Sequence, residues 1–189
     1  MSDMVPVMLI IALFCEATLI AMLVWSIFVP DRRLWPPRQV SWLSQIMVWI
    51  PTVAVSGSAI VIGIAEWNDL NWPLWFQWGV GLPLIFTGNA VVWPAVLRIG
   101  LDATSGAEAE LKTDGVYRWS RNPQYVADMG ILLGWAILSA APSAWIIAIG
   151  GVVAFALAPI AEEPWLGEVY GAPYRRYRTR VPRFFSVPR

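Results

Sequence analysis

The sequence contains no histidine and only one cysteine among its 189 residues. Without histidine, the chain can have no histidine general base, no serine–histidine catalytic pair and no histidine-ligated metal centre. We therefore expect no metal site. Cys15 lies within the first apolar run, and it has no second cysteine with which to form an intrachain disulfide.

Basic residues are missing from most of the chain, although the formal net charge is zero. All 13 Lys and Arg fall in three segments: residues 32–38, 98–121 and 175–189. Because basic residues concentrate on the cytoplasmic side of membrane proteins, this distribution predicts one orientation. The parts expected inside are 30–41, 98–122 and the tail from Glu162. The parts expected outside are the N-terminus, 66–72 and 140–142.

Hydrophobic residues make up 58% of the chain, 13 residues are Trp, and the mean hydropathy is +0.58, which is typical of an integral membrane protein. Five apolar segments are predicted: Met4–Val29, Trp42–Ala65, Pro73–Leu97, Pro123–Ser139 and Ser143–Ile160. A membrane-spanning helix needs about 20 residues, so the last two are short. They are separated by three residues and should form an antiparallel hairpin. We expect an all-α, polytopic membrane protein with five transmembrane helices and a short cytoplasmic helical tail.

The most informative polar motif occupies residues 115–125, between two apolar segments. Asn122 and Pro123 predict the start of a helix, because Asn is a favoured N-cap and Pro is tolerated at the first helical position. A helix N-terminus attracts carboxylates and phosphates. Arg118 and Arg121 flank this one. They could help to bind an anionic ligand, or they could simply anchor the chain to lipid phosphates.

The pair Glu162–Glu163 follows the last apolar segment, where a helix C-terminus disfavours carboxylates. Pro164 is expected to end the helix and to hold the second glutamate in an extended conformation. The pair needs a nearby cation, which is either Arg118, Arg121 or a tail arginine in a salt bridge, or the ammonium group of a ligand. The hairpin should bring Asn122 and the glutamate pair to the same membrane face, close together.

The C-terminal segment 171–185 is rich in arginine and aromatic residues and predicts a short interfacial helix. Tyr174 and Tyr177 are three residues apart and share one face of it. Basic aromatic helices are typical of the surfaces of anionic membranes, so we expect contact with membrane lipids. No nucleic-acid partner is expected, because the basic segment adjoins the membrane.

Three polar residues are predicted within the spans: Glu16, Asn89 and Asp128. An ionisable group at membrane depth is a candidate functional group, although helix packing or a protonated buried acid equally explains Glu16. Asp128 lies three residues after Tyr125 and should line the same pocket. Gly130 and Gly134 could allow another helix or a cofactor to approach the backbone.

Three motifs in order resemble those of a known superfamily. They are Leu111-Lys112-Thr113-Asp114-Gly115-Val116-Tyr117-Arg118 continuing to Arg121-Asn122-Pro123-Gln124-Tyr125, then Glu162-Glu163, then Tyr174, Tyr177 and Arg180-Val181-Pro182-Arg183-Phe184. Residues 111–185 resemble the isoprenylcysteine carboxyl methyltransferase and phospholipid methyltransferase superfamily of integral membrane enzymes. We expect one membrane domain, 1–189, in a bacterial inner membrane. Its parts would be three spans in residues 1–100 and a cofactor-binding half in 101–189.

The resemblance also implies that S-adenosylmethionine is bound on the cytoplasmic side. The implied cofactor-binding residues are Tyr117, Arg118, Arg121, Asn122, Pro123, Tyr125, Glu162, Glu163, Tyr174 and Tyr177. We expect Glu163, Arg180 and Asp128 to take part in catalysis. The expected activity is methyl transfer to a lipophilic small molecule or lipid, with an isoprenylcysteine-type carboxylate, a phospholipid amine and a small thiol all open as acceptors.

Two other functions remain open at this stage. The related sterol reductases carry an acid near the position of Asp128, so the chain could be an NADPH-dependent isoprenoid or sterol reductase. Alternatively, it could be a non-enzymatic membrane scaffold or carrier in which Glu16 and Asn89 line a path. The sequence leaves the oligomeric state open as well.

Overall fold

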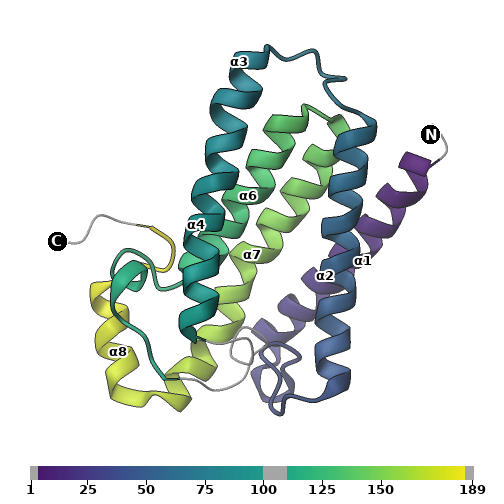
Figure 1. Cartoon of the computed structure of the whole chain (residues 1–189). Helices are drawn as coiled ribbons and strands as arrows, with labels where there is room; N and C mark the ends of the chain where they lie inside the picture. The colour runs from purple at the N-terminus through teal and green to yellow at the C-terminus, as the bar shows by residue number, and fades with distance from the viewer. Residues whose placement is uncertain (1–3, 100–109, 186–189) are drawn as a thin grey trace.

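The computed structural model describes residues 4–99 and 110–185, which form helices and loops with no strand among them (Figure 1). The helices are α1 (Met4–Phe28), α2 (Trp42–Ala65), α3 (Leu74–Phe76), α4 (Leu82–Ile99), α6 (Pro123–Ser139), α7 (Pro142–Val169) and α8 (Gly171–Arg180). Short 3₁₀ turns at Pro30–Arg32 and Gly115–Arg118 lie in the connections. The predicted boundary near residue 100, part of the basic segment 98–122 and the extreme termini lie outside the described residues.

Four helical segments are long and apolar enough to cross a membrane: Met4–Phe28, Trp42–Ala65, Leu74–Leu97 and Pro142–Val169. Their number and hydropathy support an integral membrane protein. The predicted helix at α6 is also present, with the bounds expected from the sequence. Its 17 residues would extend about 26 Å, slightly less than the apolar thickness of a bilayer. A fifth crossing by α6 therefore stays a prediction.

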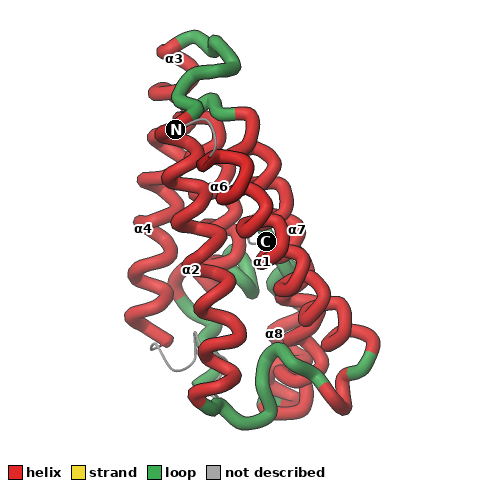
Figure 2. The backbone as a smooth tube through the Cα atoms, turned by 90° about the vertical axis from the view of Figure 1, so that its right-hand side faces the viewer, coloured by secondary structure: helices red, strands yellow, loops and turns green. Residues whose placement is uncertain are grey.

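The long helices lie side by side, and their connections gather at two ends of the bundle (Figures 1 and 2). One end holds the α2–α3 connection and the α6–α7 turn. The other end holds the α1–α2 connection and α8. The distribution of basic residues predicted that 30–41 and the C-terminal tail lie on one side of the membrane, and that 66–72 and 140–142 lie on the other. The two ends of the bundle group these segments in the same way.

The α6–α7 hairpin is present and is fastened to the α2–α3 connection. Ala140 adopts a left-handed conformation, with φ 46°, at the end of α6. The backbone N–H of Asn68 donates to the Ser139 carbonyl at 2.7 Å. The Glu66 carboxylate accepts from the backbone N–H of Ser143 at 2.9 Å and from its hydroxyl at 2.8 Å, which satisfies donors at the start of α7. These contacts fix the alignment of the hairpin at this end.

The segment before α4 contains a five-residue π-helix, Gln77–Gly81, that the sequence did not predict. Gln77 is fully buried, and its side-chain amide donates to the Asn68 side chain at 2.7 Å and to the Trp72 carbonyl at 2.8 Å. A π-turn shifts the helix phase locally. Here it turns Gly81 toward α6.

The prediction that the last span ends before Glu162 was wrong. Helix α7 continues to Val169, so the glutamate pair and Pro164 lie inside it. A proline within a helix removes one backbone hydrogen bond and costs about 3 kcal/mol. The buried contacts that both glutamates make, described below, favour the continuous helix. Because the helix is unbroken, the two carboxylates leave it on different sides, about 100° apart.

The polar residues and glycines predicted within the spans have different surroundings in the structure. Glu16 is buried, and its carboxylate packs against the backbone of α7 at Gly150. Asn89 makes its hydrogen bonds within α4, donating to the Ile85 carbonyl at 2.8 Å. A Cβ added at Gly134 would lie 2.8 Å from the Gly81 carbonyl oxygen, so Gly134 allows α6 to meet the π-helix closely.

Replacing Gly134 with alanine should therefore destabilise the protein. The new methyl group would overlap the Gly81 carbonyl, and such overpacking typically costs about 1–3 kcal/mol. Gly130→Ala is the matched control on the same helix, because a Cβ there would meet no atom within 4 Å. We expect the Gly130 variant to be as stable as the original or slightly more stable, since alanine favours a helix over glycine. Thermal unfolding in detergent measures both, and equal midpoints for the two variants would contradict the close approach.

Candidate functional site

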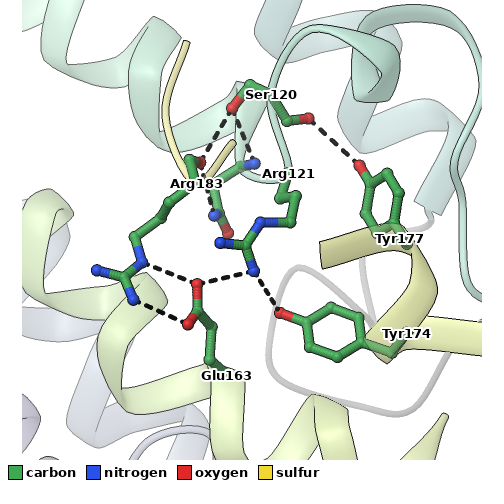
Figure 3. A network of polar contacts seen from close by, with 7 residues as sticks. Ser120, Arg121, Glu163, Tyr174, Tyr177 and Arg183 are labelled. Carbon is green, nitrogen blue, oxygen red and sulfur yellow. Dashed lines mark hydrogen bonds and ion pairs between the residues drawn. The ribbon is translucent and has the colours of Figure 1, made fainter. Parts of the chain in front are cut away.

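Three segments far apart in the sequence meet at the end of the bundle that holds α8. They are the loop that precedes α6, the last turns of α7, and α8 with the tail that follows it. Figure 3 shows the polar network that joins them. The network lies where the sequence predicted two opposite charge clusters to come together.

Glu163 is the centre of this network. Its Oε1 lies 3.0 Å from Nη1 of Arg121 and accepts a hydrogen bond from Nε of Arg183 at 2.8 Å. Its Oε2 accepts from Nη2 of Arg183, also at 2.8 Å, so this second pair is bidentate. The Arg121 and Glu163 side chains are only 8% and 9% exposed. The prediction that the basic motif before α6 lies close to the glutamate pair is confirmed.

The network contains two guanidinium groups and one carboxylate, so it carries surplus positive charge. The hydrogen bond from Arg183 to Glu163 raises the pKa of the Arg183 guanidinium. The Nε atom of Arg121 is buried and has no hydrogen-bond partner among the described residues. A buried donor of this kind is costly unless an acceptor completes it. The site is therefore suited to an anionic group.

Tyrosines fasten α8 to the loop before α6. Nη1 of Arg121 donates to the Tyr174 hydroxyl at 3.3 Å, and the Tyr177 hydroxyl lies 3.4 Å from the Ser120 carbonyl (Figure 3). The Tyr177 hydroxyl also donates to the Tyr117 carbonyl at 2.6 Å. All three tyrosines are buried and form one cluster. Burial raises the pKa of the Tyr177 hydroxyl, which keeps it a donor. The prediction that Tyr174 and Tyr177 share a face of a helix is confirmed.

The tail after α8 runs back along the loop before α6. The backbone N–H of Arg121 donates to the Pro182 carbonyl at 3.0 Å, and the side-chain amide of Asn122 donates to the Arg183 carbonyl at 2.9 Å. Asn122 occupies the N-cap position, and Pro123 begins α6 as predicted. However, the Asn122 side chain makes no capping hydrogen bond. Its amide is used to hold the tail instead, so the expected capping contact was wrong.

Glu162 faces a different set of residues. Its Oε1 accepts from the indole Nε1 of Trp35 at 2.7 Å and from the Tyr125 hydroxyl. The Trp35 ring packs beside a buried cluster that includes Leu23 and Ala158. Trp35 comes from the connection between α1 and α2, and sequence reasoning missed it. A lone tryptophan in a basic loop gives no sign of a partner 127 residues away.

The remaining predicted residues lie outside the network. Arg118 and Arg180 have exposed side chains, and Asp128 is half-buried on α6, one turn after Tyr125. Among the described residues, no hydrogen bond or ion pair joins any of these three to Glu163. The tail arginine that pairs with Glu163 is Arg183. The sequence could have indicated Arg183, since it is the last residue of the motif Arg180-Val181-Pro182-Arg183.

The fold and this network together define a helical membrane protein with a charged, tyrosine-lined site at one end of its bundle. Residues 76–173 match the family model described as phospholipid methyltransferase, which is more than half of the chain. The chain therefore belongs to the phospholipid methyltransferase family, and this membership implies methyltransferase activity in general. Comparisons with curated proteins and with solved structures give no match.

The matched region does not contain all of the residues that contact the two glutamates. It includes Arg121, Tyr125, Glu162 and Glu163, but Trp35 precedes it and Arg183 follows it. The family segment thus supplies the centre of the site. Residues on either side of that segment complete it.

Replacing Arg183 with glutamine should loosen the tail. The substitution removes two charge-assisted hydrogen bonds to Glu163, and because Arg183 is partly exposed we expect a loss of about 1–2 kcal/mol. The apparent midpoint of thermal unfolding should fall by a few degrees, and trypsin should cut the tail sooner. Arg176→Gln is the control, since Arg176 is an exposed arginine on α8. If the two variants behave alike, the ion pair does not hold the tail.

Proposed function

We propose that this protein is an S-adenosylmethionine-dependent methyltransferase that acts on a lipophilic acceptor within the membrane. The observation that carries the proposal is the buried Arg121 guanidinium, which contacts Glu163 and keeps one donor without an acceptor among the described residues. A buried cation beside a carboxylate is what a ligand with an amino-acid end requires. Family membership supports a methyltransferase rather than a reductase or a scaffold.

The residues present fit this cofactor at both of its charged ends. Arg121, with its unused Nε and the surplus positive charge around it, suits the carboxylate. The glutamate pair supplies the negative charge that the ammonium group needs. Tyr125 lies beside Phe155, with ring centroids 5.8 Å apart, and such aromatic faces attract a sulfonium by about 0.5–2 kcal/mol. The site thus offers a complement to each charge of the cofactor.

When bound, the cofactor supplies an activated methyl group. The protein's own contribution is to position the reactants and to exclude water, because in-line methyl transfer needs little else. The tyrosine cluster and the tail serve this purpose by covering the site on the side of α8. Arg180 and Asp128 remain our candidates for contacts with the acceptor.

The acceptor determines whether a base is needed. A carboxylate acceptor needs none, whereas an amine or a thiol must lose a proton. Without histidine, the base would be an acidic residue or a tyrosine. Asp128 is the candidate that we favour, because it is half-buried and one helical turn from Tyr125. The acceptor would enter sideways from the bilayer, between helices.

The proposed orientation places the N-terminus outside and the site on the cytoplasmic side, with α6 as the fifth crossing. Two observations support it. The basic connection between α1 and α2 lies at the same end of the bundle as α8 (Figure 1). Four of the six basic residues of the C-terminal segment are exposed on α8: Arg175, Arg176, Arg178 and Arg180. A cytoplasmic leaflet rich in anionic lipids would favour both.

Calorimetric titration of the purified protein with S-adenosylmethionine tests the proposal. We expect binding by the original protein and a loss of at least about tenfold in affinity for Arg121→Gln, which corresponds to about 1.4 kcal/mol. Arg121→Lys keeps the charge but not the fork of donors, so it should fall between the two. Thermal unfolding checks that each variant is folded. Absence of cofactor binding together with tight binding of NADPH would replace this proposal with a reductase.

Methyl transfer itself can be measured with a labelled cofactor and a membrane extract. We expect label to enter a lipophilic product and Glu163→Ala to abolish the transfer, because this variant leaves the buried Arg121 and the partly exposed Arg183 without their carboxylate. A scaffold or a carrier would transfer no label. The chemical nature of the labelled product identifies the acceptor.

A further inference from the structure

An apolar groove with a volume of about 490 Å³ runs along α1, away from the charged network. Phe14 and Trp25 are large side chains that line it toward its two ends along the helix. Between them lie the smaller side chains of Ala17, Thr18 and Ala21. Small residues between large ones leave a hollow in the surface of the helix.

The groove faces the bilayer rather than the rest of the protein. Helix α1 packs against α2 and α7 with its other side, where Glu16 and Leu23 are buried. Because each residue turns an α-helix by about 100°, Phe14, Ala21 and Trp25 share the face opposite to these two. Helix α1 is long and apolar enough to cross a membrane. The occupant of a groove on this face is therefore a lipid chain.

The length of the groove corresponds to one leaflet of a bilayer. The 11 steps from Phe14 to Trp25 rise about 16 Å along the helix, and half of a bilayer's apolar thickness is about 15 Å. Trp25 is half-exposed near the end of α1, and tryptophan is typical of the membrane–water interface. The groove thus follows the path of one acyl chain, from the middle of the bilayer to its surface on the α8 side.

An arginine lies where the groove reaches that surface. The Trp25 indole Nε1 donates to the Arg32 carbonyl at 3.0 Å, which places Arg32 beside the end of the groove. The Arg32 side chain is exposed and forms no ion pair with any residue that the structure describes. Arg33 is directed elsewhere, since its guanidinium lies over the Trp165 ring, 6.0 Å from the centroid. The Arg32 guanidinium is thus available for a phosphate, which it can bind through two parallel hydrogen bonds.

The wall of the groove near this arginine is held in place by the protein itself. Leu34 lines the groove from the connection between α1 and α2, and its backbone N–H donates to the Ser26 hydroxyl at 2.9 Å. Ser26 is 1% exposed, and its hydroxyl donates to the Met22 carbonyl at 2.7 Å. A wall that is already ordered lowers the entropic cost of binding.

We propose that this groove and Arg32 form a binding site for one anionic phospholipid of the leaflet on the α8 side. One acyl chain lies along α1 from Phe14 to Trp25, and Arg32 binds the phosphate. The connection 30–41 holds three arginines and a single acid, Asp31, so it favours a negatively charged headgroup over a zwitterionic one. The site is on the far side of α1 from α7. Its lipid is therefore a bound partner of the protein, separate from the methyl acceptor of the proposed function.

Lipid binding can be measured on the full-length protein, purified in a non-ionic detergent. Native mass spectrometry counts the lipids retained when phosphatidylglycerol or phosphatidylcholine is titrated in. We expect one phosphatidylglycerol to be retained with an affinity about tenfold or more above that of phosphatidylcholine, as for a charge-assisted contact. The preference should shrink as salt is added, because Arg32 is exposed.

Two pairs of variants locate the site. Arg32→Gln should remove most of the preference for phosphatidylglycerol, whereas Arg38→Gln, an exposed arginine of the same connection, should keep it. Ala21→Trp fills the groove, so retention of phosphatidylglycerol should fall severalfold. Ile10→Trp is its control, since Ile10 is 67% exposed on the same face of α1 but outside the groove. None of these residues contacts the Glu163 network.

Three results would overturn the assignment. Equal retention of the two lipids by the original protein would show only non-specific contact with the bilayer. If Ala21→Trp converts a dimer into a monomer, the groove belongs to an interface with a second copy of the chain. If Ala21→Trp does not fold, Arg32→Gln decides the question, and an unchanged preference in that variant would contradict the site. Because the measurement needs neither cofactor nor turnover, its failure leaves the proposed function untouched.

Discussion

The ion pairs of Glu163 with Arg121 and Arg183 are the contacts on which the rest of the site depends. They join the loop before α6, the end of α7 and the tail that follows α8. Removing one partner of a buried ion pair leaves a charge without compensation, which is strongly unfavourable. The network therefore fixes both the position of the tail and the direction of the Arg121 side chain. A ligand would meet a site that is already organised.

The opposite end of the bundle determines whether those charges can meet. Glu66 holds the start of α7, and Gly134 allows α6 to lie against the π-helix. These contacts set the position of α6 relative to α7 along their axes. Arg121 and Glu163 therefore lie at the same height at the other end of the hairpin. A shift by one helical turn, about 5.4 Å, would separate them. The contacts at one end of the bundle and the ion pairs at the other are thus linked through α6 and α7.

Much of the fold could be predicted because membrane helices obey simple rules of length and composition. The bounds of α2 and α6 agree with the apolar segments, and the hairpin follows from a connection of three residues. The errors arose where tertiary contacts outweighed local preference. Pro164 normally ends a helix, yet buried contacts of both glutamates favour its continuation. Asn122 normally caps a helix, yet its amide holds the Arg183 carbonyl.

The sequence by itself determined the helices, the grouping of basic segments, the family and the two charge clusters that should meet. Local periodicity, composition and motif order carry that information. Only the tertiary structure decided that Arg183 pairs with Glu163, and that Glu162 takes Trp35 as its partner. The choice of partner depends on the rotation of α7 about its axis and on contacts between residues distant in the chain. A single sequence does not encode either in a local pattern.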